Sequence, residues 1–266
     1  MTRITRLFFF VLMAGSMIAA AQTSNPNTPG AGYDPPSLAS TGTGLHSIPG
    51  NPVAQVREDR SWEYGPFINY GIGVGDRSSY KFLSAGFELG KNISPVIHAG
   101  VFSGQFEYAG NIMPLWQAYT PAPHYDSNYM CVENGTASPC TLLVGGGTFR
   151  GVSLTPVIFR WNFLTNSRRI QPWFQAAGGL IYTTHEFPPD FEGKQIVNGV
   201  AVTMDGSTSV WNFSPQGGFG IHYFTKAKRS IDLGVNAVHI SSASLGDRNP
   251  GVNASLQFQL GYTFWK

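Results

Sequence analysis

The sequence predicts an eight-stranded antiparallel up-and-down β-barrel of the outer-membrane type, and three observations lead to this fold class. Only 12% of the 266 residues are charged and 14% are aromatic, whereas soluble domains usually contain about 25% charged residues. The 32 Gly and 18 Pro exclude helical bundles and coiled coils, because these need strong helix formers. Apolar and polar residues also alternate with period two, as in strands with one apolar face.

The first 21 residues have the three regions of a secretory signal peptide. Arg3 and Arg6 precede an apolar stretch that runs to Ile18, and a run of three alanines then ends at Ala21. The apolar stretch is shorter than the roughly 20 residues that span a bilayer. We therefore expect residues 1–21 to be cleaved rather than retained as a membrane anchor.

The next segment, residues 22–59, is rich in Pro, Gly, Ser and Thr and lacks apolar periodicity. This composition predicts a flexible leader, so the barrel is expected over residues 60–266. Eight segments of that domain alternate or are apolar enough to form strands. They lie at about 62–74, 83–89, 95–108, 150–163, 171–186, 211–223, 231–241 and 255–264.

The lengths of the connections and the composition of the polar face distinguish a membrane barrel from a soluble sandwich or lipocalin-like barrel. Connections at 109–148, 187–206 and 242–252 are long, and those between them are short, as in up-and-down membrane barrels. Only the first connection, at about 75–79, fails to be long. The polar face is rich in Gly, Ser, Asn and Gln, which suits a narrow lumen better than a solvated surface.

Four ionisable residues fall on the polar face of their strands: Glu63, Glu88, Arg160 and His222. Eight strands leave an interior just wide enough for side chains. We therefore expect these residues to form a paired network that fills the lumen, and we do not expect a channel.

Several classes of partner and cofactor are not expected. The net charge of +2 without a basic run argues against nucleic-acid binding. Cys131 and Cys140 lie close together, and in an exported chain they predict a local disulfide that closes a loop. No His lies near them at ligand spacing, so they do not predict a zinc site, and neither a metal nor a cofactor is expected.

A polar pair, His239 and Ser241, lies on the apolar face of the seventh predicted strand. Residues two apart on one face are about 6.6 to 6.8 Å apart at their backbones, so a histidine to serine hydrogen bond is within reach. A histidine can take the proton of a serine hydroxyl, whose oxygen then attacks an ester carbonyl. On a lipid-facing surface that ester would belong to a lipid.

The segment from Ala237 to Asn253 resembles the C-terminal signature of the lipid A 3-O-deacylase family. Members of this family are eight-stranded outer-membrane barrels with an H-x-S-N motif at the end of the seventh strand. A glutamate follows an N-x-G segment at the start of their eighth strand. The resemblance implies that His239 is the general base and Ser241 the nucleophile.

Two motif positions depart from the family. Ser242 stands where the family has an asparagine of the oxyanion hole, and Asn253 stands where it has the glutamate that orients the histidine. An asparagine can orient an imidazole but cannot stabilise the imidazolium by charge. Asp247, in the same loop, is an alternative carboxylate, although a solvated turn residue is the simpler interpretation.

The resemblance implies an ester hydrolase that removes an acyl chain from lipid A in the outer leaflet of a Gram-negative outer membrane, without metal or cofactor. The alternative is a non-catalytic structural or adhesive barrel that has lost part of the triad, with the loop of Cys131 and Cys140 as its contact surface. A soluble ligand-binding barrel is a third hypothesis. The sequence leaves open whether the chain is a monomer or a homodimer.

Overall fold

The computed structural model describes residues 50–133, 136–187, 194–197, 200–203, 209–243, 245 and 253–266. The predicted signal peptide and most of the predicted leader lie outside these residues. Contacts divide the chain into Met1–Gly44 and Leu45–Lys266, and the described residues all belong to the second unit. Within the described residues, no helix is long and apolar enough to cross a membrane.

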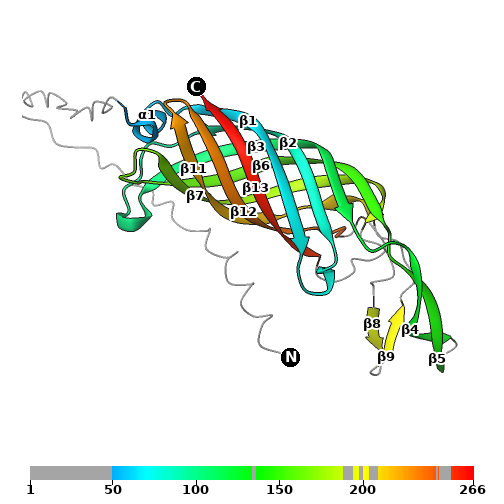
Figure 1. The fold of residues 1–266 in the computed structure, drawn as a ribbon. Coiled ribbons are helices and arrows are strands. Elements are labelled where there is room, and N and C mark those ends of the chain that lie inside the picture. The colour runs from blue at the N-terminus through cyan, green and yellow to red at the C-terminus, as the bar shows by residue number, and fades with distance from the viewer. Residues whose placement is uncertain are drawn as a thin grey trace, which may run out of the picture. The chain divides into compact units, whose positions relative to one another are not determined.

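The main antiparallel sheet closes into an eight-stranded barrel, in which β10 and β11 together count as one strand. This confirms the predicted fold class (Figure 1). The hydrogen-bonded order is β7-β11-β12-β13-β1-β2-β3-β6, and pairing of β6 with β7 closes the circle. The short strand β10 pairs with the far part of β7 and continues the line of β11. The strands are β1 (Trp62–Gly73), β2 (Lys81–Asn92), β3 (Gly104–Tyr119), β6 (Thr148–Phe163), β7 (Ile170–Phe187), β10 (Ser209–Phe213), β11 (Gln216–Lys226), β12 (Arg229–His239) and β13 (Ala254–Trp265).

The distribution of side chains is the inverse of that in a soluble protein. Along β1 exposed and buried residues alternate without a break. Ile68 is 45% exposed, whereas Glu63 is 2% exposed. An apolar outer surface and a polar interior are what a barrel in lipid requires, so the two faces lie as the alternation predicted.

The third strand lies later in the chain than the sequence indicated. It was expected at 95–108 and runs from Gly104 to Tyr119, preceded by the 3-10 turn η2 (Gly100–Phe102). Gly100 has a φ of +60°, a conformation that breaks an extended strand. The apolar residues before Gly104 therefore form a turn, and Glu107 is brought into the barrel wall.

A short helix, α1 (Pro52–Glu58), lies within the segment expected to be a flexible leader. The side chain of Asn51 accepts a hydrogen bond from the backbone N–H of Ala54 at 3.1 Å, an N-cap that starts the helix. Val53 and Val56 pack against Phe224 and Trp265. The leader prediction is wrong for residues 52–58. Val53 and Val56 lie about one helical turn apart, and both pack against the end of the barrel, which stabilises the helix.

Two hairpins occupy the long connections. They are formed by β4 (His124–Glu133) with β5 (Thr136–Val144), and by β8 (Lys194–Val197) with β9 (Val200–Thr203). Cys140 on β5 is disulfide-bonded, and no cysteine in the described part of the chain is free. Its register partner is Tyr129, two residues before Cys131 on β4. The pairing of Cys140 with Cys131 stays a prediction from the sequence.

Both ends of the lumen are filled. At the end with the short turns, Val53 and Val56 of α1 cover Phe224 and Trp265. At the end with the long loops, the ring of Phe187 lies 5.1 Å from that of Phe149 and 5.6 Å from that of Trp116. Apolar and aromatic side chains therefore pack together at each end of the described interior.

Candidate functional site

The outward row of β12 ends in the two polar residues that the sequence singled out. Every second residue from Asp232 to Ser242 is buried, and the residues between them are exposed or half-buried. His239 and Ser241 both belong to the outward row, after Ile231, Leu233, Val235 and Ala237. A histidine and a serine thus follow four apolar residues on the outer face of the barrel.

Backbone hydrogen bonds hold this pair in an extended conformation. The N–H of His239 donates to the carbonyl of Pro215 at 3.0 Å, and Phe213 and Ser241 exchange two backbone bonds of 2.7 and 3.0 Å. On the other side, His239 is the register partner of Ala254 on β13. The backbone of the pair is therefore held between two neighbouring strands, although the pair lies at the end of β12.

The hydroxyl of Ser241 also has a defined place. Its oxygen accepts a hydrogen bond from the backbone N–H of Ala243 at 3.1 Å. Ala243 has a φ of +49°, which turns the chain back towards the serine. Because this bond uses an oxygen lone pair, it is compatible with donation of the hydroxyl proton to an imidazole.

The structure does not bring Asn253 to His239. The carbonyl of Asn253 accepts a hydrogen bond from the N–H of Ile240 at 2.8 Å. Asn253 and Ile240 therefore lie opposite each other, and both belong to the inward rows of their strands. Asn253 is 2% exposed, and its amide group has no hydrogen-bond partner among the described residues. In this register the side chain of Asn253 therefore lies on the opposite face of the barrel wall from that of His239.

Ser242, the other predicted residue of this segment that the structure describes, does not lie on the outward face either. Ser242 is fully buried, so its side chain does not share the outward surface with Ser241. Asp247 lies outside the described residues. Within the described part of the chain the outward residues next to His239 are Pro215 and Ala254, and neither carries a carboxylate.

An apolar groove of about 560 Å³ lies further along the same outer face. It crosses β1, β11, β12 and β13, and its lining includes Tyr70, Phe219, Leu233, Val235, Phe258 and Leu260. Val235 precedes His239 by four residues on the same row, a distance of about 13 Å along a strand. The polar pair therefore lies on the same outward row as part of this apolar groove, but does not line it.

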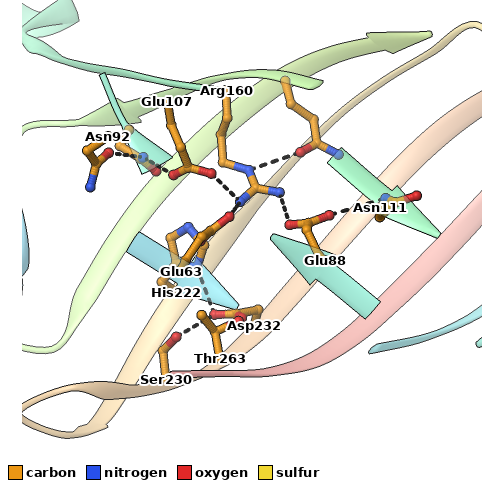
Figure 2. Close-up of polar contacts among 12 residues, drawn as sticks. Glu63, Glu88, Asn92, Glu107, Asn111, Arg160, His222, Ser230, Asp232 and Thr263 are labelled. Carbon is orange, nitrogen blue, oxygen red and sulfur yellow. Dashed lines mark hydrogen bonds and ion pairs between the residues drawn. The ribbon is translucent and has the colours of Figure 1, made fainter. Parts of the chain in front are cut away.

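The lumen holds the ionic network that the polar face predicted (Figure 2). The guanidinium of Arg160 contacts Glu63 at 2.7 Å and Glu88 at 2.6 Å. Its third carboxylate is Glu107 at 2.8 Å, which the sequence did not single out because the segment expected at 95–108 has no regular alternation. His222 does not join Arg160 directly. Its Nδ1 lies 2.7 Å from Asp232, a buried residue of β12.

Comparisons with known proteins identify relatives. The model of the family described as Lipid A 3-O-deacylase (PagL) matches residues 102–263, more than half of the chain. Among solved structures, the outer membrane enzyme PagL is similar with a TM-score of 0.39 and 16% identity, covering 74% of this chain and 98% of that chain. A comparison with curated proteins gave no match.

Two further solved barrels are similar to the chain. Neisserial surface protein A has a TM-score of 0.41 and 12% identity, covering 77% of this chain and 95% of that chain. Ail, the attachment invasion locus protein of Yersinia pestis, has a TM-score of 0.34 and 13% identity, covering 77% and 97%.

Proposed function

Because the chain belongs to the lipid A 3-O-deacylase family, we propose that it removes an ester-linked acyl chain from lipid A at the outer leaflet of the outer membrane. His239 and Ser241 carry the reaction. The observation that supports this most is their position as the polar end of an otherwise apolar outward row. A soluble substrate has no access to that row, whereas a membrane lipid lies directly against it.

The chemistry follows from the two side chains. The imidazole of His239 takes the hydroxyl proton of Ser241, and the serine oxygen attacks the ester carbonyl of the lipid. The tetrahedral intermediate collapses when the protonated imidazole gives its proton to the departing sugar hydroxyl. Water, activated by the same histidine, then hydrolyses the acyl serine and releases the fatty acid.

The apolar groove supplies the place for the acyl chain. Its lining from four neighbouring strands is almost wholly apolar, and its position along the row of His239 lets a chain extend from the ester into the groove. Binding the chain in this way orients the carbonyl carbon towards Ser241, and orientation is a large part of catalysis.

The reaction is expected to be slow. Replacing the carboxylate of a serine triad by its amide costs about 10⁴ in rate. In this chain the family's glutamate position holds Asn253, whose side chain is buried on the inward face. Catalysis would then rest on a histidine and serine dyad without the charge that stabilises the imidazolium.

A carboxylate at position 254 should therefore accelerate the reaction, whereas one at position 253 should not. Ala254 lies directly opposite His239, so the Ala254→Glu side chain can reach the imidazole from the neighbouring strand. We expect a gain of about tenfold or more in the rate of deacylation, part of what a triad carboxylate contributes. The matched variant Asn253→Glu points into the lumen, and a gain there would contradict the register.

Release of fatty acid from purified lipid A tests the proposed function. The refolded chain is incubated with lipid A in mixed micelles, and the products are followed by mass spectrometry. We expect loss of one acyl chain together with the matching free fatty acid. Lipid A that keeps all its acyl chains after prolonged incubation with folded protein would exclude deacylation.

The departures at Ser242 and Asn253 favour one alternative, a structural or adhesive barrel without catalytic activity. Its contact surface would be the β4–β5 hairpin, whose Cys140 is disulfide-bonded. The same incubation separates the two functions, since this alternative predicts unchanged lipid A. Both functions place the protein in the outer membrane, and neither requires a homodimer.

A further inference from the structure

We propose that the barrel lumen binds one divalent metal ion of the zinc class between Glu63, Glu107 and His222. Atoms able to coordinate a metal, one from each residue, lie within 4.8 Å of one another. Figure 2 shows the three side chains gathered on one side of the Arg160 guanidinium, with Glu88 on the other side. The sequence predicted no metal site, because no His lies at ligand spacing from its cysteines and these three residues belong to strands far apart in the chain.

Two buried atoms in this group have no hydrogen-bond partner among the described residues. They are Oε2 of Glu63 and Nε2 of His222. Glu63 is 2% exposed and His222 is 1% exposed, so bulk water does not satisfy either atom. Buried polar atoms normally have a partner, and an exception calls for an ion or a water molecule.

The histidine is prepared for coordination. Its Nδ1 lies 2.7 Å from Oδ1 of Asp232, and Asp232 also accepts hydrogen bonds from Ser230 and Thr263. A hydrogen bond from Nδ1–H to this carboxylate leaves the lone pair of a neutral imidazole on Nε2. A carboxylate behind a histidine in this way is the usual outer support of a metal ligand.

The charges of the lumen call for a further cation. Glu63, Glu88, Glu107 and Asp232 carry four negative charges when ionised, and Arg160 carries one positive charge. With all four carboxyl groups ionised and His222 neutral, the cluster has a net charge of −3, and an uncompensated buried charge is costly. A divalent ion reduces the net charge to −1 and contacts the carboxylates that Arg160 shares.

The donor set indicates the class of ion. One imidazole nitrogen with two carboxylate oxygens suits zinc and similar first-row ions, whereas magnesium and calcium prefer oxygen ligands alone. Ligand atoms bind zinc at about 2.0 to 2.2 Å, so the three side chains must draw together slightly. The ion would join β1, β3 and β11, which are not neighbours in the barrel. It would therefore cross-link strands through the lumen.

Metal binding is tested on the refolded full-length chain after treatment with EDTA and desalting. We expect the chain to take up about one zinc ion per molecule, measured by mass spectrometry of the element after gel filtration. Cobalt(II) added in place of zinc should produce the visible absorption of a low-symmetry protein site. Zinc should also raise the urea concentration needed to unfold the barrel, because it binds only the folded state.

The variants His222→Gln and Glu63→Gln should lose the ion and the cobalt spectrum, whereas the matched control His98→Gln, which changes an exposed histidine, should keep both. If a variant does not fold, the cobalt spectrum and the effect of zinc on unfolding of the wild-type chain decide the question. The proposal is overturned if the wild-type chain binds no stoichiometric metal, as expected if a proton shared by the carboxylates replaces it. Equal zinc retention by folded His222→Gln would overturn it as well.

Discussion

Replacing Ser241 by alanine should lower the rate of fatty acid release from lipid A by at least about 10³-fold, because the variant lacks the oxygen that attacks the ester. The barrel itself should remain folded. The strand contacts of residue 241 use its backbone N–H and carbonyl, which alanine retains. The hydrogen bond from Ala243 to the hydroxyl is lost, at a cost of about 1 kcal/mol.

His239→Ala should have an effect of the same order, since serine and histidine act as a unit and the loss of either removes the mechanism. The matched controls are Ser78→Ala and His185→Ala, which change exposed residues away from the pair. Folding of each variant is checked by its heat-dependent mobility on gels. Activity of Ser241→Ala or His239→Ala within a factor of ten of the wild type would rule out the assignment of these residues.

Replacing Arg160 by methionine should lower the free energy of unfolding by about 3 to 5 kcal/mol, the range observed when one partner of a buried ion pair is removed. Arg160 is 1% exposed and contacts three carboxylates. Without the guanidinium, these carboxylates remain buried and repel one another. Urea unfolding in detergent micelles, followed by tryptophan fluorescence, measures the change.

Two further variants separate the loss of charge compensation from the loss of packing. Arg150→Met changes an exposed arginine on the same strand and should be nearly neutral. Changing Glu63, Glu88 and Glu107 to glutamine in the Arg160→Met background should recover part of the stability, because the uncompensated charges are removed together. An Arg160→Met barrel as stable as the wild type would show that the network does not carry charge in the folded state.

The outward pair could be read from the chain because it depends on a local rule. Side chains in a strand alternate between faces with period two, so the row from Ile231 to Ser241 was visible before any partner strand was known. The same rule placed Arg160, Glu63 and Glu88 inside. It did not reveal Glu107, because the segment expected at 95–108 has no regular alternation.

Asn253 shows that the alternation of side chains along one strand does not determine the contacts between strands. The motif placed this residue beside His239, but pairing with β12 puts Ala254 there instead. A register shift of one residue moves every side chain of a strand to the other face. Position in a motif therefore does not determine which side chain meets the imidazole, and contacts between strands do.

The amino-acid sequence by itself determined the number of barrel strands, the direction of their apolar faces and the outward position of His239 and Ser241. Each of these follows from the spacing of neighbouring residues along one strand. Only the tertiary structure decided the register at Ala254, the helix that closes one end and the partners of Arg160. These depend on residues as far apart as Glu63 and Arg160, which are separated by 97 positions. Closure of the barrel brings such residues together, and no local pattern records it.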